Sequence, residues 1–247
     1  MTYLSYEGFE TWFYYSSDND DDHNNQHYFD TFEKRLFEVS PAGERLGSIA
    51  LGMLLLYEIP VSFLTPSLHD TLMTIHHIAM ILVACLGVGI FSPNGDPVGT
   101  YYLSFYFGVI ELSSVFLAVA SLFHPKKGKH WHDFMNNING PGGDVLRSSI
   151  KVCRILFCIA FLILRTIYFP IVISSSVWDF WNGYNLPDDK RYGVSKWIFL
   201  STCVVCFLFS FLQLFWGLLV AKVLARDIGL IIDDENKKAT TKEGKNI

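Results

Sequence analysis

Long apolar runs separated by short polar segments dominate the chain. The runs cover residues from about 46–64, 72–91, 101–123, 152–174 and 197–224. Each is close to the roughly 20 residues that an α-helix needs to cross the hydrocarbon core of a bilayer. The pattern therefore predicts an all-α fold, a polytopic transmembrane helix bundle with five clear spans.

Turn-forming and polar residues mark the connections between these runs. Residues 92–97 read Ser-Pro-Asn-Gly-Asp-Pro, which is typical of a tight turn. Residues 124–148 and 179–191 are predicted to be polar loops. Pro60 lies inside the first run, where we expect it to kink the helix.

The two ends of the chain differ from its middle. Residues 1–15 are aromatic, but too short and too interrupted to cross a bilayer, and residues 16–31 are acidic and polar, as in exposed segments. We therefore expect three parts: an acidic and aromatic N-terminal segment (1–39), a transmembrane domain (40–225) and a charged tail (226–247).

Composition and charge support a membrane protein and suggest its orientation. The chain is 51% hydrophobic and 17% charged, which argues against an ordinary soluble domain. Lys and Arg are concentrated in the loop 124–148 and in the tail, and such basic segments stay in the cytosol. We expect a cytosolic C-terminus, an N-terminal segment outside, membrane lipids as partners and no nucleic acid.

Ionisable and amide side chains interrupt all of the apolar runs. They are Glu58, His76, His77, Glu111, Arg165 and Gln213. Such residues usually face a bundle interior or a water-filled cavity, and isolated buried charges need partners. With a helical rise of about 1.5 Å per residue, most of them fall in the cytosolic half. We expect a polar-lined tunnel, in which Glu58, Glu111 and Arg165 pair with one another or with the histidines.

This polar set has more than one interpretation. It can line a lipid-binding cavity, or it can be a hydrogen-bonded network that fixes the registry of the helices. A metal site is a third possibility, with ligand types at His76, His77, Glu58 and Glu111 and in the loop at His124, His130 and His132. The chain has only eight histidines, so we expect no metal and no other cofactor. Adjacent helical positions diverge by about 100°, so at most one of the paired histidines should point squarely into a tunnel, and the other should pack against a neighbouring helix.

The order and spacing of short motifs resemble the TLC domain family, named for TRAM, LAG1 and CLN8, from about Phe32 to Arg226. The motifs are Ser40-Pro41-Ala42-Gly43-Glu44-Arg45-Leu46 with Gly52 and Tyr57-Glu58, the pair His76-His77, Glu111-Leu112-Ser113, Arg165 with Pro170, and Leu212-Gln213-Leu214-Phe215-Trp216. The resemblance implies about six helices around a membrane tunnel, and residence in the endoplasmic reticulum. In the ceramide synthase branch, the paired histidines serve acyl transfer from acyl-CoA to a sphingoid amine.

The chain departs from that branch at the acidic motif which follows the histidines. Ceramide synthases carry a pattern of the form HDxSDxxLE; aligned on Glu111, this chain has Leu103, Ser104, Phe107 and Ile110 at the His, first Asp, second Asp and Leu positions. It therefore looks nearer the TLCD-type members, which are associated with lipid homeostasis. We favour a non-enzymatic lipid-binding protein. The alternatives are an acyltransferase that uses His76 or His77 with acyl-CoA as co-substrate, and a cargo-handling protein of the CLN8 kind.

Overall fold

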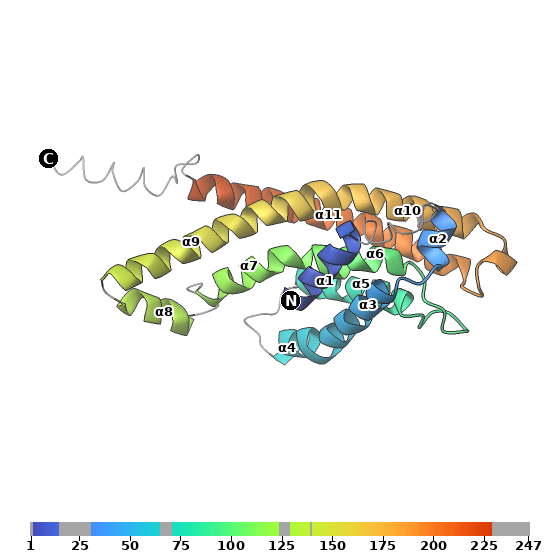
Figure 1. Cartoon of the computed structure of the whole chain (residues 1–247), viewed down its shortest axis with the longest axis horizontal. Helices are drawn as coiled ribbons and strands as arrows, with labels where there is room; N and C mark the ends of the chain where they lie inside the picture. Colours follow the sequence, from blue (N-terminus) through green and yellow to red (C-terminus); the bar gives the residue numbers. More distant parts are fainter. Residues whose placement is uncertain (1, 15–30, 65–70, 124–128, 139, 229–247) are drawn as a thin grey trace, which may run out of the picture.

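The computed structural model describes residues 2–14, 31–64, 71–123, 129–138 and 140–228, and every regular element in these ranges is a helix (Figure 1). Helices of 24, 23, 44 and 31 residues are long and apolar enough to cross a membrane, and a fifth apolar helix has 17 residues. The predicted all-α polytopic bundle is confirmed.

Each predicted apolar run is helical, and three runs contain a π-helical segment. In chain order the runs form α3 (Pro41–Met53), η1 (Leu54–Glu58) and α4 (Ile59–Leu64); α5 (Thr71–Gly87); α6 (Thr100–Ser104), η3 (Phe105–Val109) and α7 (Glu111–Leu122); α9 (Pro141–Phe161), η4 (Leu162–Tyr168) and α10 (Phe169–Asn185); and α11 (Lys196–Asp227). The additional short helices are α1 (Thr2–Tyr14), α2 (Phe32–Phe37), α8 (Lys129–Asn137) and the 3-10 turn η5 (Asp188–Lys190).

Several predicted boundaries are wrong. Helix α5 ends at Gly87 rather than near 91, and the chain turns at Gly89, whose φ of 80° favours glycine. The predicted loop 124–148 contains α8 and the first turns of α9. At the other end, α10 continues to Asn185, so Asp179 is a fully buried helical residue and not part of a loop.

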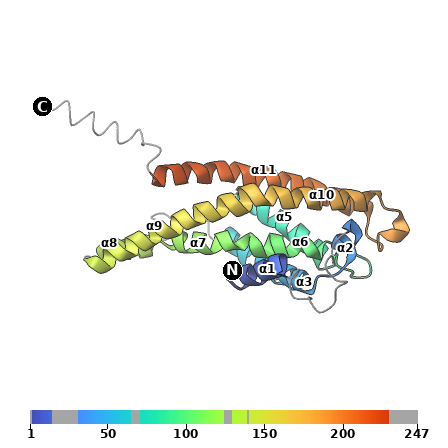
Figure 2. The same ribbon diagram turned by 45° about the horizontal axis from the view of Figure 1, so that its top comes forward.

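The helix formed by α9, η4 and α10 is much longer than a membrane span requires. Its 44 residues correspond to about 66 Å, whereas the hydrocarbon core is about 30 Å thick. The excess includes the polar first turns of α9, which carry Asp144, Arg147 and Lys151. These turns extend away from the bundle and pack against α8 (Figures 1 and 2).

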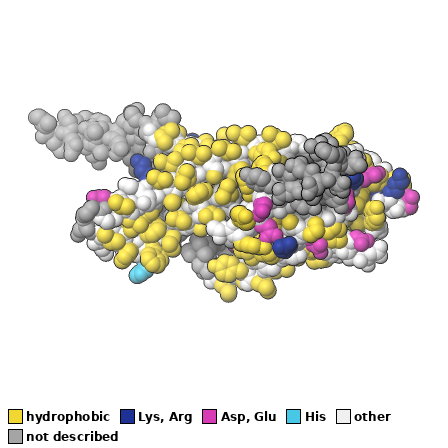
Figure 3. All heavy atoms as spheres, viewed as in Figure 1, with side chains coloured by type: hydrophobic (Ala, Val, Ile, Leu, Met, Phe, Trp, Pro, Cys, Tyr) yellow, Lys and Arg dark blue, Asp and Glu magenta, His cyan; other side chains and the backbone are white. Residues whose placement is uncertain are grey.

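The long helices run antiparallel along the bundle axis. Helix α10 packs against α11, α7 against α9, and α3 against α5 and α6. Helix α8 and the end of α11 lie at one end of the molecule, and α2 lies at the other with the end of α10 (Figures 1 and 2). The face drawn in Figure 3 is mostly hydrophobic along the bundle, as expected for a surface that contacts lipid acyl chains.

Glycines allow two helix pairs to approach closely. Helix α1 crosses η3 at Gly8 and Gly108, where a Cβ atom on Gly8 would lie only 2.2 Å from the Cα atom of Gly108. Helix α3 meets α6 at Gly43, where a Cβ atom would lie 2.0 Å from the carbonyl oxygen of Thr100. Small residues at crossings of this kind are typical of helix packing in membranes.

The end of the bundle that holds α2 is closed by a buried ion pair. Arg35 on α2 donates from Nε to Oδ2 of Asp179 at 2.6 Å, and from Nη2 to Oδ1 at 2.9 Å. The hydroxyl of Tyr102 on α6 donates to the same carboxylate. Three elements that are distant in sequence are therefore joined at one buried acid, which we call the α2-end cluster.

Candidate functional site

Three charged residues of the membrane-spanning helices lie in or next to π-helical segments. Glu58 is the last residue of η1, Glu111 follows η3 after one residue, and Arg165 lies within η4. Pro60 and Pro170 come shortly after η1 and η4, and a proline removes one backbone N–H from the helical hydrogen-bond ladder. Single-turn π segments are frequent at functional sites.

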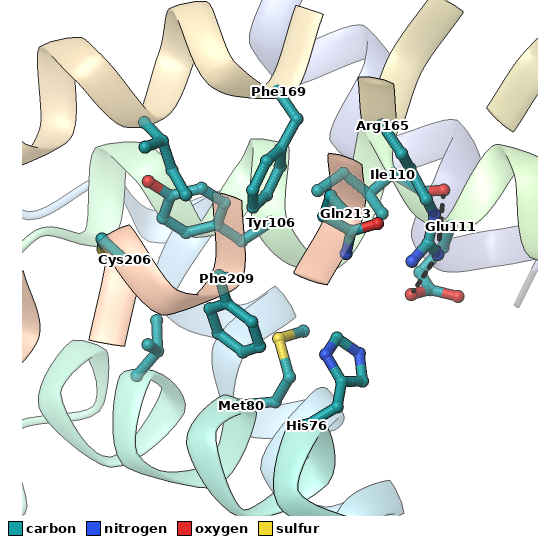
Figure 4. A pocket seen from close by; sticks show the side chains of 12 residues that line it. His76, Met80, Tyr106, Ile110, Glu111, Arg165, Phe169, Cys206, Phe209 and Gln213 are labelled. Carbon is teal, nitrogen blue, oxygen red and sulfur yellow. Dashed lines mark hydrogen bonds and ion pairs between the residues drawn. The ribbon is translucent and has the colours of Figure 1, made fainter. Parts of the chain in front are cut away.

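Arg165 is buried and surrounded by oxygen atoms from the start of α7. Its Nε donates to Oγ of Ser113 at 2.9 Å, and its Nη2 donates to Oγ of Ser114 at 3.0 Å and to the carbonyl oxygen of Ile110 at 3.4 Å. The same Nη2 lies 3.6 Å from Oε1 of Glu111 (Figure 4). The expected pairing of Glu111 with Arg165 is confirmed.

The two serines were not among the predicted site residues. Serine is common in apolar helices, so neither residue interrupts its run as a charge does. The sequence did contain a signal that these serines lie together. Ser113 and Ser114 come three and four positions after Ile110, so they share its helix face.

The histidine pair on α5 faces a cavity and is only partly satisfied. The ring of His76 packs edge-on against Phe209 and Trp216 of α11, at centroid distances of 5.1 and 5.4 Å. Within the described part of the chain, Nδ1 of His76 and Nδ1 of His77 are buried without a hydrogen-bond partner. Both residues line the larger cavity described below. The expected division of roles is therefore too simple, because His76 both lines the cavity and packs against α11.

Gln213 occupies the middle of α11 and is almost completely buried, with 1% of its surface exposed. Its Oε1 also lacks a hydrogen-bond partner among the described residues. A buried amide oxygen without a partner is costly and uncommon in folded proteins. Gln213 is therefore the residue on this helix that most clearly indicates a binding site.

A cavity of about 590 Å³ lies between the helices and brings most of the predicted residues together. Glu58, His76, His77, Glu111 and Arg165 all line it. Apolar side chains from eight elements form most of the rest of its wall, among them Leu4, Met53, Met73, Leu117, Phe157 and Leu219. Its volume lies within the usual range of small-molecule sites, and its polar groups share the wall with a large apolar surface.

A much smaller cavity, of about 20 Å³, adjoins the larger one. Gln213 lines this smaller cavity together with apolar residues such as Phe169, Ile173 and Phe209 (Figure 4). Four residues line both cavities: His76, Met80, Glu111 and Arg165. All six predicted polar residues thus line two adjoining cavities, and whether they bind a ligand stays a prediction.

The loop histidines do not join this site. His130 and His132 lie on α8, near the end of the molecule, and His124 falls outside the described residues. Among the residues that the structure describes, no three His, Cys, Asp or Glu side chains converge in a group that could hold a metal ion.

These features define a multi-pass α-helical membrane protein with a polar-lined cavity inside its membrane-spanning bundle. The TLC domain model, for the TRAM, LAG1 and CLN8 proteins, matches residues 1–222, so the chain belongs to the TLC domain family. The match includes α1, which lies before the region on which the sequence resemblance rested. No curated protein and no solved structure matches the chain. Membership of this family indicates a membrane protein with a lipid-related role.

Proposed function

We propose that the protein binds a membrane lipid in the larger cavity and acts in lipid homeostasis, in the manner of the TLCD-type members rather than the ceramide synthases. The observation that carries this proposal is the amphipathic wall of the cavity. Apolar side chains line most of it, and the charged and imidazole groups gather around Arg165, Glu111 and His76. A lipid has the same division between an apolar chain and a polar head.

The apolar wall offers the larger share of the binding free energy. Burial of apolar surface contributes about 25 cal/mol per Å², so one acyl chain against Met53, Leu117 and Phe157 is a substantial favourable term. The polar groups then fix which end of the lipid enters first. This arrangement is typical of small-molecule sites, in which a few polar groups orient a ligand held by apolar contacts.

A role limited to helix registry explains the site less well. In a network that serves only structure, the buried polar atoms should satisfy one another, because an unmade buried hydrogen bond costs about 1–3 kcal/mol. Here His76, His77 and Gln213 each keep a buried atom without a partner among the described residues. A bound lipid head group supplies the missing partners.

Lipid retention by the purified protein tests the proposal. Native mass spectrometry of the protein in mild detergent should show a co-purifying lipid. The double substitution Glu58→Gln with His77→Ala should reduce its occupancy, whereas Asp189→Asn, at an exposed position on η5, should not. Absence of any bound lipid, together with an unchanged cellular lipid profile on deletion of the gene, would contradict the proposal.

The second candidate is acyl transfer from acyl-CoA, and the two unpartnered imidazole nitrogens favour it. A histidine with a free ring nitrogen can act as a general base or an acyl carrier. The His position and the second Asp position of the synthase motif, however, hold packing residues here: Leu103 contacts the glycine positions 47 and 87, and Phe107 lines the larger cavity. Incorporation of labelled acyl-CoA into sphingoid base by the wild type but not by His77→Ala would favour this candidate, and equal background rates in both would exclude it.

We further propose residence in the endoplasmic reticulum with a cytosolic C-terminus. The end of α11 lies at the same end of the bundle as α8, and the sequence that follows α11 contains several lysines, in agreement with the charge rule. Protease protection of a tag placed after residue 247 tests this orientation, since a cytosolic tag is digested in intact microsomes and a lumenal tag is protected.

A further inference from the structure

We infer that the smaller cavity, between His76 and Gln213, binds the hydroxyl group of a neutral lipid whose chain lies in the larger cavity. The inference rests on the proposed lipid binding and specifies the chemical class of the head group. The volume of the smaller cavity, its unpartnered polar atoms and the charge balance at its mouth each support this conclusion.

Volume restricts what can enter the smaller cavity. A cavity needs about 10–15 Å³ of space to hold one water molecule, and this one offers about 20 Å³. A single oxygen atom with its hydrogen fits that space. A phosphate or a quaternary ammonium group has several heavy atoms and does not fit beside Phe209 and Gln213 without displacing them.

The unpartnered atoms on Gln213 and His76 are best satisfied by a group that both donates and accepts hydrogen bonds. Oε1 of Gln213 accepts only, so its partner must be a donor. A neutral imidazole carries one donor and one acceptor nitrogen, so Nδ1 of His76 can serve either role. A hydroxyl donates one hydrogen bond and accepts others, and so it can satisfy Gln213 and His76 together. An ionised phosphate only accepts, and would leave Oε1 of Gln213 without a partner.

The charges around the mouth of the smaller cavity balance each other. Arg165 and Glu111 line both cavities and form an ion pair of zero net charge. Arg165 is further engaged by Ser113, Ser114 and the carbonyl oxygen of Ile110. The pair therefore presents no uncompensated charge that would select an anionic or cationic head, and a neutral group is favoured.

The path into the smaller cavity passes from the larger one. His76 and Met80 on α5 line both cavities, so a chain held in the larger cavity can extend its terminal group past them. In Figure 4, the Gln213 amide lies among Ile110, Phe209 and Arg165, above the imidazole of His76. Gln213 is thus placed as a specificity-determining residue for the lipid head.

A matched set of single-chain probes tests the inference: oleyl alcohol, its methyl ether and oleyl phosphate, each added to delipidated full-length protein and measured by native mass spectrometry. The wild type should bind the alcohol about ten-fold more tightly than the ether, which corresponds to one good hydrogen bond, and should disfavour the phosphate. Gln213→Met should bind the alcohol and the ether equally. Leu208→Met, at an exposed position of the same helix that lines neither cavity, should keep the preference.

The outcomes separate this inference from the proposed function. Equal binding of the alcohol and the ether by the wild type, or a preference for the phosphate, would overturn the hydroxyl site and leave lipid binding intact. Failure of the wild type to bind any of the three probes or any native lipid would overturn both. If Gln213→Met does not fold, His76→Phe replaces it, since a phenyl ring keeps the contacts with Phe209 and Trp216 and removes the ring nitrogens.

Discussion

Two buried arginine–carboxylate pairs hold different parts of the bundle, and they differ in how completely they are satisfied. In the α2-end cluster, Asp179 is fully buried and receives two hydrogen bonds from Arg35 and a third from Tyr102. Beside the cavity, Nη2 of Arg165 comes no closer than 3.6 Å to Oε1 of Glu111. The first pair is closed by its own partners, whereas the second lies open to space that a ligand can enter.

The difference shows which buried charges are structural and which belong to a site. The hydrogen bonds that Arg35 donates to Asp179 raise the pKa of the guanidinium, so Arg35 keeps its charge at any physiological pH. Nothing further is needed to satisfy it. The groups around Arg165 include buried nitrogen and oxygen atoms on His76 and Gln213 that have no partner among the described residues. We propose that these atoms, beside an open cavity, are completed by a ligand.

Asp179→Asn should have the largest effect on folding. It leaves the partly buried guanidinium of Arg35 without its counter-charge and disturbs the fully buried acceptor of Tyr102, and breaking such a pair costs up to about 3 kcal/mol. Thermal unfolding followed by size-exclusion chromatography should show a clearly lowered midpoint, whereas the control Asp189→Asn should not. A midpoint like that of the wild type would mean that the α2-end cluster does not stabilise the bundle.

Gly8→Val should have an intermediate effect that reaches both regions. Helix α1 contributes Leu4 to the larger cavity, and its Trp12 donates from Nε1 to the hydroxyl of Tyr168 at 2.9 Å. A side chain at Gly8 collides with Gly108, and overpacking of this kind costs about 1–3 kcal/mol.

Both stability and lipid retention should therefore fall in Gly8→Val, measured by thermal unfolding and native mass spectrometry. Gly52→Ala is the matched control, because a Cβ atom there meets no other atom within 4 Å, and it should unfold at or above the wild-type midpoint. If both variants behaved like the wild type, α1 would not be packed against η3 as described.

Glu111→Gln should have the smallest effect on stability. Arg165 keeps its bonds to Ser113, Ser114 and Ile110, so the loss should be about 1 kcal/mol. Lipid retention should nevertheless fall, because the substitution leaves a net positive charge at the mouth of the smaller cavity. A large loss of folded protein would instead place this pair with the structural ones.

Hydropathy was sufficient to predict the five long apolar helices and most of the candidate site. Charged and amide residues inside apolar runs are few, and all six predicted ones line the two cavities. A polar residue is noticed only where it contrasts with an apolar run. Ser113 and Ser114 do not, because their hydroxyl groups satisfy Arg165 without lowering the hydropathy of the helix.

Asp179 was missed for a different reason. It follows an apolar run and precedes a polar segment, so its position looked like the start of a loop. Its burial depends on Arg35, which lies 144 residues earlier in the sequence. Arg35 is on a short helix that no periodic pattern of apolar residues predicts. The π-helical segments were not predicted either. Prolines follow η1 and η4 but not η3, so no single sequence feature marks all three segments.

Electron cryo-microscopy of the full-length protein in lipid nanodiscs tests the central claim most directly. We expect elongated density in the larger cavity, beginning between Leu117 and Leu219 and ending beside His76 and Gln213, with none beside Asp179. A cavity filled by rearranged side chains, with His76 and Gln213 hydrogen-bonded to protein atoms, would contradict the account.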